Sequence, residues 1–225
     1  MRVYYSTLCK IGSDLSKYLD EMIQYGGDAI ELMMDGPEWN EFQDRGQELI
    51  ELLSEKTANY SIHTPSWDMN LTSENVRARN AALDSYRDSI VFASKLHASH
   101  VVIHPGFCYA PTFDKTAARE RAGQAIDLLC RFNQEYRVPL LVENVGSCAT
   151  SIFSQDEYIR FIESFAGQIG CLLDVGHAHM CGWDLPKTIA QLKPYLCAVH
   201  LHDNHGDADS HLPIGCGTVP WKSVF

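Results

Sequence analysis

The sequence lacks any long apolar run. None of its 225 residues lies in a stretch that approaches the roughly 20 apolar residues of a membrane-spanning helix. The first ten residues, MRVYYSTLCK, contain no apolar segment of the kind that directs secretion. These absences predict a cytoplasmic protein without a membrane partner.

The sequence also lacks paired cysteines. Eight cysteines are scattered along the chain, and no two of them form a C-x-x-C pair. This scatter predicts reduced thiols rather than a disulfide framework. Cys171 and Cys197 lie inside apolar runs, where a free cysteine behaves as a small hydrophobic residue.

Positive charge is scarce as well. The 18 lysines and arginines oppose 29 aspartates and glutamates, which gives a formal net charge of −11, and no Lys/Arg cluster is visible. Such a surface repels polyanions and disfavours a nucleic-acid partner. A cleft that held several metal ions would, however, carry positive charge of its own.

What the sequence does contain is a regular alternation of short apolar runs with segments of helical period. The apolar runs are rich in β-branched residues, as expected of buried strands. The runs are RVYYS (2–6), DAIELM (28–33), NYSIH (59–63), HVVIH (100–104), PLLVEN (139–144), GCLLDVGH (170–177) and LCAVHLHD (196–203). Residues 15–23 and 118–132 have helical spacing, and Ser154 with Glu157 forms a capping box that opens another helix.

Repeated strand-then-helix units predict right-handed crossovers and an all-parallel sheet covered by helices. An open doubly wound sheet usually has a glycine-rich phosphate-binding turn after its first strand, and STLCKIGSDL has none. The sequence therefore favours an α/β fold of the (β/α) TIM-barrel type, formed as a single domain over residues 1–225.

The predicted strands end on side chains that bind divalent cations. A single such residue is more often a satisfied loop residue or a helix cap, but barrel packing gives no reason for five strands in a row to end this way. Because the carboxyl ends of barrel strands meet at one mouth, these residues should be neighbours in space. They predict a metal site. They are His63, His104, Glu143, Asp174 and His200.

A segment rich in histidine and aspartate, VHLHDNHGDADSHLPIGCG (199–217), spans the end of the last predicted strand and the residues after it. It places Asp209 two residues before His211, and DVGH places His177 three residues after Asp174. A solvated loop could carry such residues by chance. Beside the strand-end residues, they are candidate metal ligands.

Three further residues are candidate substrate contacts. Glu31, in AIELM, points into the barrel mouth if its strand ends there and could bind substrate hydroxyls. Trp67 could stack on a substrate ring or simply pack. His202 could contact substrate, orient a metal ligand or lie on the surface.

Four segments resemble those of the xylose isomerase-like TIM-barrel superfamily, which includes sugar isomerases and epimerases and the endonuclease IV branch (AP endonuclease family 2). The segments are VVIHPG, LLVENVG, LLDVGHAHMCG and HLHDNHGDADSHLPIGCG, in this order. A match to HPG alone would be weak evidence for the family, whereas matches to four segments in register are specific evidence. The likeness runs from the first predicted strand to about Trp221.

The resemblance implies a divalent-metal cofactor. In the isomerase and epimerase branch one ion, typically manganese, cobalt, magnesium or zinc, has ligands that correspond to Glu143, Asp174 and His200, together with a second glutamate. In the endonuclease branch the resemblance implies a three-zinc cluster with additional ligands. These correspond to His63, His104, His177, Asp209 and His211. We therefore expect one to three ions per chain.

The sequence departs from both branches at its end. Both take a last glutamate from the eighth strand, whereas this sequence ends at TVPWKSVF, after the seventh predicted strand. Barrels of this kind usually need about 250 residues. Either the sequence is truncated or the barrel lacks its eighth strand, with exposed edges that could pair with another copy in a homo-oligomer. Cys216 also stands where related sequences commonly have a charged or polar residue.

These observations lead to three hypotheses. The leading one is a metal-dependent ketose isomerase or epimerase of carbohydrate metabolism that works through an enediolate. In it Glu143 is both ligand and catalytic carboxylate, His177 holds a substrate oxygen, and the missing glutamate would be the second base. The second is a zinc-dependent endonuclease IV-type phosphodiesterase acting on abasic DNA, which the net charge disfavours. The third is a non-catalytic metal-binding relative.

Overall fold

Seven parallel strands form one curled sheet. The computed structural model describes residues 2–40 and 42–224. The strands follow one another in the sheet in sequence order, and every neighbouring pair is parallel. They are β1 (Tyr5–Ser6), β2 (Ala29–Met33), β3 (Asn59–His63), β4 (Val101–Ile103), β5 (Leu140–Glu143), β6 (Gly170–Asp174) and β7 (Leu196–His200).

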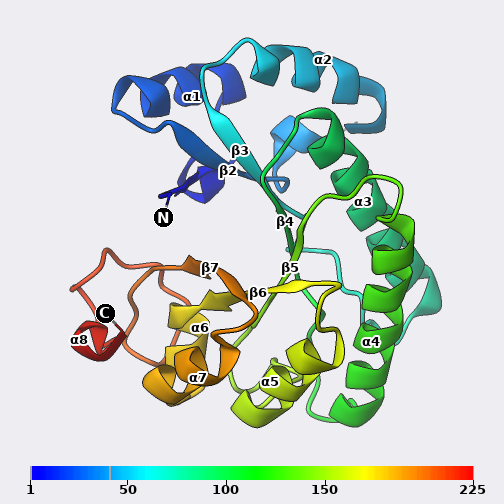
Figure 1. Ribbon diagram of the computed structural model, residues 1–225, viewed down its shortest axis with the longest axis vertical. Coiled ribbons are helices and arrows are strands. Elements are labelled where there is room, and N and C mark those ends of the chain that lie inside the picture. Colours follow the sequence, from blue (N-terminus) through cyan, green and yellow to red (C-terminus); the bar gives the residue numbers. More distant parts are fainter. Residues whose placement is uncertain (1, 41, 225) are drawn as a thin grey trace.

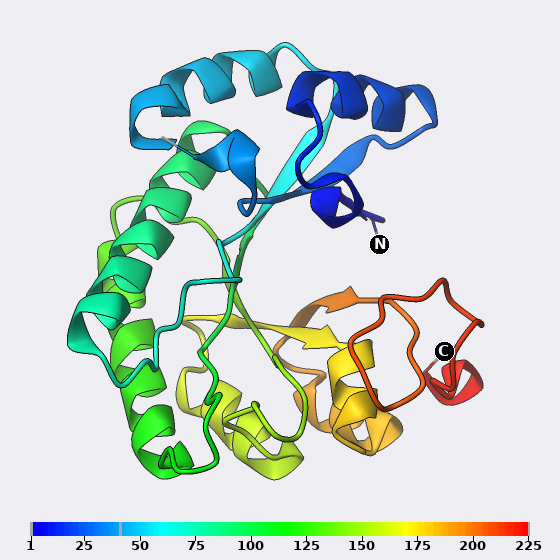
Figure 2. The ribbon, with the colours of Figure 1, turned by 180° about the vertical axis from the view of Figure 1, so that it is seen from behind.

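Helices connect the strands and cover the outer face of the sheet (Figure 1; Figure 2 shows the opposite side). They are α1 (Leu15–Gln24), α2 (Phe42–Ser54), α3 (Val76–Lys95), α4 (Lys115–Phe132), α5 (Gln155–Ser164), α6 (Val175–Met180), α7 (Leu185–Leu192) and α8 (Trp221–Val224), with 3-10 turns η1 (Thr7–Lys10) and η2 (Pro37–Trp39). Among these described helices, none is long and apolar enough to cross a membrane.

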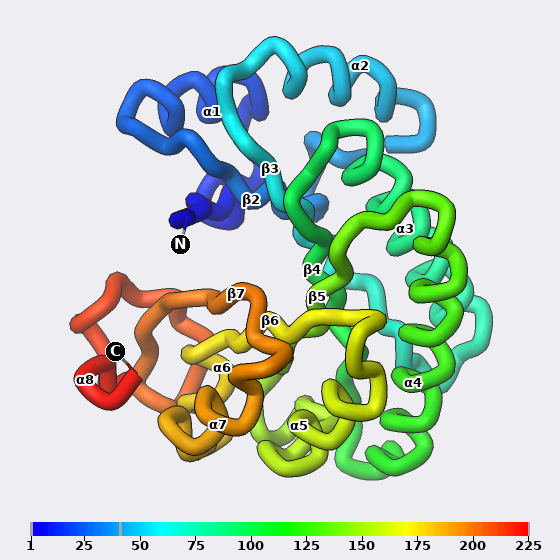
Figure 3. Tube along the Cα trace, in the orientation of Figure 1, coloured from blue at the N-terminus to red at the C-terminus, as the bar shows by residue number. Residues whose placement is uncertain are grey.

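The curl of the sheet confirms the predicted TIM-barrel architecture. The tube in Figure 3 places β2 and β7 on opposite sides of an open ring. Within the described residues no strand joins β1 to β7, so the fold is a TIM barrel that lacks the eighth strand, as expected. Tyr5 in β1 and Val199 in β7 are correspondingly 52% and 38% exposed. Pairing of these edges with another copy stays a prediction.

The predicted helix signals are confirmed. In α5 the Glu157 carboxylate accepts hydrogen bonds from the backbone amide and the hydroxyl of Ser154, at 2.9 and 2.8 Å. The helix over residues 15–24 ends before Gly26, whose φ of +91° suits glycine. The alanine-rich stripe of α4 is buried against the sheet.

Two predicted strands differ from the observed ones. Only Tyr5 and Ser6 of the run 2–6 pair with β2, over the register Tyr5–Ile30 and Ser6–Glu31. The run 170–177 contains both a strand and the start of a helix, because the Asp174 carboxylate accepts the backbone N–H of His177 at 2.6 Å and caps α6.

The eight cysteines all lie among the described residues, and none forms a disulfide, as predicted. Cys171 is buried in β6. Cys197 is exposed, in contrast to the prediction that it is a buried small residue, because β7 is an edge strand of this sheet.

A small apolar layer lies beneath the mouth of the barrel. The main core fills the space between the sheet and the helices, and a separate cluster lies on the inner face. Each residue of the inner-face cluster precedes a strand-end polar residue by two positions, so the two side chains share the inward face of their strand. The cluster consists of Val102, Leu141, Leu172 and Ala198. The strand-end side chains therefore rest on an apolar floor.

Candidate metal centre

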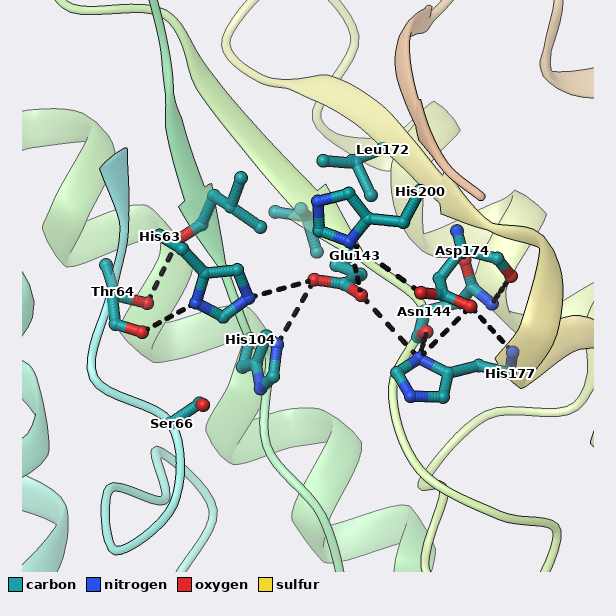
Figure 4. A network of polar contacts seen from close by, with 12 residues as sticks. His63, Thr64, Ser66, His104, Glu143, Asn144, Leu172, Asp174, His177 and His200 are labelled. Carbon is teal, nitrogen blue, oxygen red and sulfur yellow. Dashed lines mark hydrogen bonds and ion pairs between the residues drawn. The ribbon is translucent and has the colours of Figure 1, made fainter. Parts of the chain in front are cut away.

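The strand-end residues predicted from the sequence meet at one end of the sheet (Figure 4). Each is the last residue of its strand or, in one case, the residue after it. Parallel strands in a curled sheet bring their carboxyl ends to one mouth, which makes neighbours of residues far apart in sequence. The residues are His63 of β3, His104 after β4, Glu143 of β5, Asp174 of β6 and His200 of β7.

Glu143 lies at the centre of this arrangement. Its Oε2 is 3.1 Å from His104 Nε2 and 3.4 Å from His63 Nε2, and we name these three residues the side group. Its Oε1 is 3.1 Å from His200 Nδ1 and 3.6 Å from His177 Nδ1. The two oxygens thus face different histidines, so one carboxylate can serve two positions.

Glu143, Asp174 and His200 form a second cluster, the inner group. Their ligand atoms lie within 4.8 Å of one another, and Asp174 Oδ2 is 3.7 Å from His200 Nδ1. The three residues end adjacent strands, and both carboxylates are buried. They are the residues to which the family resemblance assigns a single divalent ion.

Glu31 contacts the other nitrogen of His200. Its Oε1 lies 3.1 Å from His200 Nε2, and the residue is only 5% exposed. β2 continues to Met33, so Glu31 lies two residues below the end of its strand and not at it. A carboxylate in this position fixes the orientation of a histidine ligand and raises its basicity. The predicted contact of Glu31 with substrate hydroxyls stays a prediction.

The segment after β7 contributes the outer group, His202, Asp209 and His211. Asp209 Oδ1 lies 3.3 Å from His211 Nε2 and 3.7 Å from His202 Nε2. His177 Nε2, from α6, lies 3.2 Å from Asp209 Oδ2. The structure therefore brings every predicted metal ligand into one continuous network.

His202 and Trp67, the other two predicted substrate contacts, have different surroundings. His202 lies inside the network, with Nε2 3.1 Å from Asp174 Oδ1. Trp67 lies in the loop after β3, where its side chain is 57% exposed and its backbone amide is 3.3 Å from Asp35 Oδ1. No polar or ring contact within the described residues joins the Trp67 side chain to the network, and its contact with substrate stays a prediction.

Backbone carbonyls orient two of the histidines. His63 Nδ1 is 2.8 Å from the Thr64 carbonyl oxygen, and His177 Nδ1 is 3.0 Å from that of Asn144 (Figure 4). Because a carbonyl only accepts, each Nδ1 is assigned as the donor, and in a neutral ring Nε2 then carries a lone pair. These lone pairs face the carboxylates of Glu143 and Asp209. Two acceptors that face each other require a proton or a cation between them.

Asn144 fixes Asp174, a contact that the sequence did not predict. Its amide nitrogen donates to the Asp174 carbonyl at 2.9 Å, and its side-chain oxygen accepts the Asp174 backbone N–H at 2.8 Å. The PLLVEN run showed an asparagine next to Glu143. It gave no sign that the side chain reaches across to the neighbouring strand.

The buried charges shift one another's pKa values. Burial alone would raise the pKa of Glu143, but the imidazoles of His200 and His104 hold it well below its ordinary value. Burial would lower the pKa of His177, but Asp174 and then Asp209 raise it to about 10. The mouth therefore holds ionised carboxylates that demand positive charge.

The donor set fits one or more divalent ions. Four groups of three residues each have ligand atoms within 4.8 Å of one another: the side, inner and outer groups, and Asp174 with His177 and His202. Mixed imidazole and carboxylate ligands suit zinc, manganese or cobalt. In the described part of the chain these groups contain no glutamate other than Glu143.

Asp203 holds the segment that carries the outer group. Its buried carboxylate accepts hydrogen bonds from the backbone amides of Gly215 and Val219 at 2.8 and 3.1 Å, and from Trp221 Nε1 at 2.8 Å. Burial would raise the pKa of Asp203, but these hydrogen bonds, led by that of Trp221, hold it below its ordinary value. This role of Asp203 was not predicted from the sequence, where the residue stands directly after the candidate residue His202.

The chain is similar to two curated proteins. The chain is 31% identical over 214 residues to "Uncharacterized protein MJ1614" of Methanocaldococcus jannaschii, covering 94% of this chain and 79% of that protein. It is 24% identical over 199 residues to a "Probable endonuclease 4" of Thermoplasma volcanium, covering 80% and 68%.

Solved structures share the fold. A "D-tagatose 3-epimerase-like protein" superimposes with a TM-score of 0.83 at 22% identity, over 100% of this chain and 84% of that one. The "IOLI protein with a binding zinc atom" gives a TM-score of 0.83 at 17% identity, over 99% and 82%. The protein-family model described as "Xylose isomerase-like TIM barrel" matches residues 19–225. With that match over nearly its whole length, the chain belongs to the xylose isomerase-like TIM-barrel family.

Proposed function

We propose that the protein is a divalent-metal-dependent isomerase or epimerase acting on a ketose or a related polyol. The observation that carries this proposal is the inner group, in which Glu143, Asp174 and His200 gather two carboxylates and one imidazole at the ends of adjacent strands. The epimerase-like and zinc-bound structures with the same fold support it.

The inner group would hold the metal ion. When bound, a divalent ion supplies Lewis acidity, which makes a C–H group between a carbonyl and a hydroxyl of the substrate easier to deprotonate. His200 would contribute Nδ1 while its Nε2–H donates to Glu31, which keeps the ring in one orientation.

Glu143 and His177 would handle the substrate. The Glu143 carboxylate is ionised at neutral pH because neighbouring imidazoles lower its pKa, so it can accept the substrate proton and return it to the adjacent carbon. His177 would hold a substrate oxygen. An isomerase that returns the proton from the same side needs one such carboxylate, whereas an epimerase needs a second base on the opposite face of the substrate.

A zinc-dependent phosphodiesterase of the endonuclease IV type is the second candidate. Two observations favour it: the side and outer groups add candidate ligands beyond the inner group, and a curated relative is described as a probable endonuclease 4. The net charge of −11 disfavours it, since binding to DNA depends on positive charge along the phosphate backbone.

Metal content and turnover, measured on the same preparation, test the proposal. The full chain is loaded with manganese, cobalt or zinc and assayed on a panel of ketoses that includes D-tagatose and D-fructose, and in parallel on DNA with an abasic site. We expect about one ion in the inner group and interconversion of at least one ketose, lost with a chelator and restored by added metal.

Two results contradict the proposal. Cleavage of abasic DNA by a zinc-loaded chain without ketose turnover would establish the second candidate. Bound metal with neither activity would indicate a non-catalytic metal-binding protein.

A further inference from the structure

His202 lies at the junction of the inner and outer groups. Its Nε2 is 3.1 and 3.2 Å from the two carboxylate oxygens of Asp174 and 3.7 Å from Asp209 Oδ1. The family resemblance assigns metal to Asp174 and to Asp209 but no role to the residue at this position. One buried imidazole nitrogen therefore faces carboxylates of both groups.

The ring of His202 makes its polar contacts through one nitrogen. The residue is only 7% exposed, and its Nδ1 is buried without a hydrogen-bond partner among the described residues. The polar contacts of this ring are thus concentrated on Nε2, the atom that faces the carboxylates.

The ring of His211 stacks on that of His202, so it is unfavourable for both rings to be charged. His202 and His211 stack with ring centroids 3.9 Å apart and planes 9° apart, and both Nε2 atoms face Asp209 Oδ1. Two imidazolium cations stacked at this distance repel each other. Two neutral rings that share one divalent ion with the carboxylate avoid that repulsion and satisfy the two Nε2 atoms.

Gly176 leaves the space that the ring needs. A Cβ atom at this position of α6 would overlap the His202 imidazole. The ring is therefore packed against backbone and has no room to rotate toward α6, which preorganises Nε2 toward the two aspartates.

We propose that His202 is a ligand of an outer metal ion, together with Asp209 and His211. The inference rests on the proposed function, since it requires that the protein binds divalent metal. It replaces the expected contact of His202 with substrate by a contact with metal.

The variant His202→Gln tests this role. The glutamine amide can still donate to Asp174 but is a poor zinc ligand, so it separates a metal ligand from a residue that only positions Asp174. The matched control is His205→Gln, an exposed position of the same segment. Zinc stoichiometry and affinity are measured by equilibrium dialysis of the full chain, and visible absorption of the cobalt-loaded chain reports on the ligand set.

We expect at least two zinc ions per wild-type chain and per His205→Gln chain. In His202→Gln the weaker ion should bind at least about 10-fold less tightly, with a changed cobalt spectrum. If circular dichroism shows that this variant is unfolded, the smaller His202→Asn is measured in its place.

Unchanged stoichiometry, affinity and cobalt spectrum in the folded variant would overturn the inference. So would a wild-type chain that binds a single ion, which would leave the proposed function intact. A wild-type chain that binds no zinc, cobalt or manganese would instead refute the proposed function itself.

Discussion

The inner and outer groups show two different ways of holding metal ligands. The inner group stands on the last residues of three adjacent strands, and Glu143 and Asp174 are 2% and 1% exposed. Asp209 and His211 of the outer group lie on an irregular segment, with side chains 43% and 41% exposed. Strand register fixes the positions of the inner-group residues, whereas those of Asp209 and His211 depend on the hydrogen bonds that hold one loop.

Hydrogen bonds to the Asp203 carboxylate hold that loop, together with backbone hydrogen bonds between Asp203 and Leu212 and from Thr218 to Asn204. Asp203 binds backbone amides 12 and 16 residues further along the chain. His211 has a φ of +45°, a left-handed conformation that is unusual for a residue other than glycine. We conclude that the inner group is preorganised by the fold and that the outer group is positioned by local contacts, so the two should respond differently to substitution.

The largest effect is expected at Glu143, which both the side and inner groups use. Glu143→Gln removes a charge that faces four histidines, so metal content should fall and any ketose turnover should drop by at least about 100-fold. Metal analysis and steady-state kinetics measure the effect. Glu55→Gln, at an exposed position, is the control, and equal metal content in the two variants would refute the central role of Glu143.

A smaller effect is expected at Glu31, which contacts His200. Glu31→Gln keeps the shape of the side chain but weakens its hold on the His200 ring, so affinity for the inner ion should fall by about 10- to 100-fold. Calorimetric titration with manganese measures this. The exposed Glu135→Gln should bind like the wild type. Unchanged manganese affinity in Glu31→Gln, together with a raised KM, would assign Glu31 to the substrate instead.

Asp203→Asn should loosen the outer group without disturbing the inner one. The loss of charge-assisted hydrogen bonds should lower the free energy of unfolding by about 1–3 kcal/mol. Because the pKa of Asp203 is lowered in the folded state, its contribution is present above the unfolded pKa of about 4 and is lost as the pH falls below it.

Thermal unfolding at several pH values checks this behaviour of Asp203. The difference in Tm between wild type and Asp203→Asn should be largest near neutral pH and shrink in acid. Asp207→Asn, exposed on the same segment, should unfold like the wild type at every pH. If Asp203→Asn removes the inner ion as well, the two groups are not independent.

The smallest effect is expected at Trp67, outside the polar network. If this exposed ring stacks on the substrate, Trp67→Ala should raise KM by about 2- to 12-fold, the value of one aromatic contact, and leave metal content unchanged. Tyr25→Ala, at an exposed ring after α1, is the control. An unchanged KM would assign Trp67 to the surface alone.

The fold and the inner group could be predicted because both follow from periodic local signals. Alternating apolar runs and helical segments specify parallel strands, and topology then brings the strand ends together. Glu143, Asp174 and His200 needed only their place at the end of a run. The error over residues 170–177 arose because Asp174 both ends a strand and caps a helix, so one apolar run covered two elements.

The contacts of His202 and Asp203 could not be predicted in this way. His202 lies two residues after His200, where the burial alternation of β7 continues, and Gly176 leaves room for its ring. Asp203 acts through backbone amides of residues 215 and 219, whose approach depends on the path of the whole segment. The path of residues 215–219 leaves no periodic trace in the sequence, and composition alone showed only that the segment is rich in histidine and aspartate.

The most direct measurement is anomalous diffraction from crystals of the full chain grown with zinc or manganese. We predict a strong anomalous peak between the Glu143 and Asp174 carboxylates and His200 Nδ1, within coordinating distance of all three. Crystals that hold metal elsewhere, with these three side chains apart and no peak between them, would contradict it.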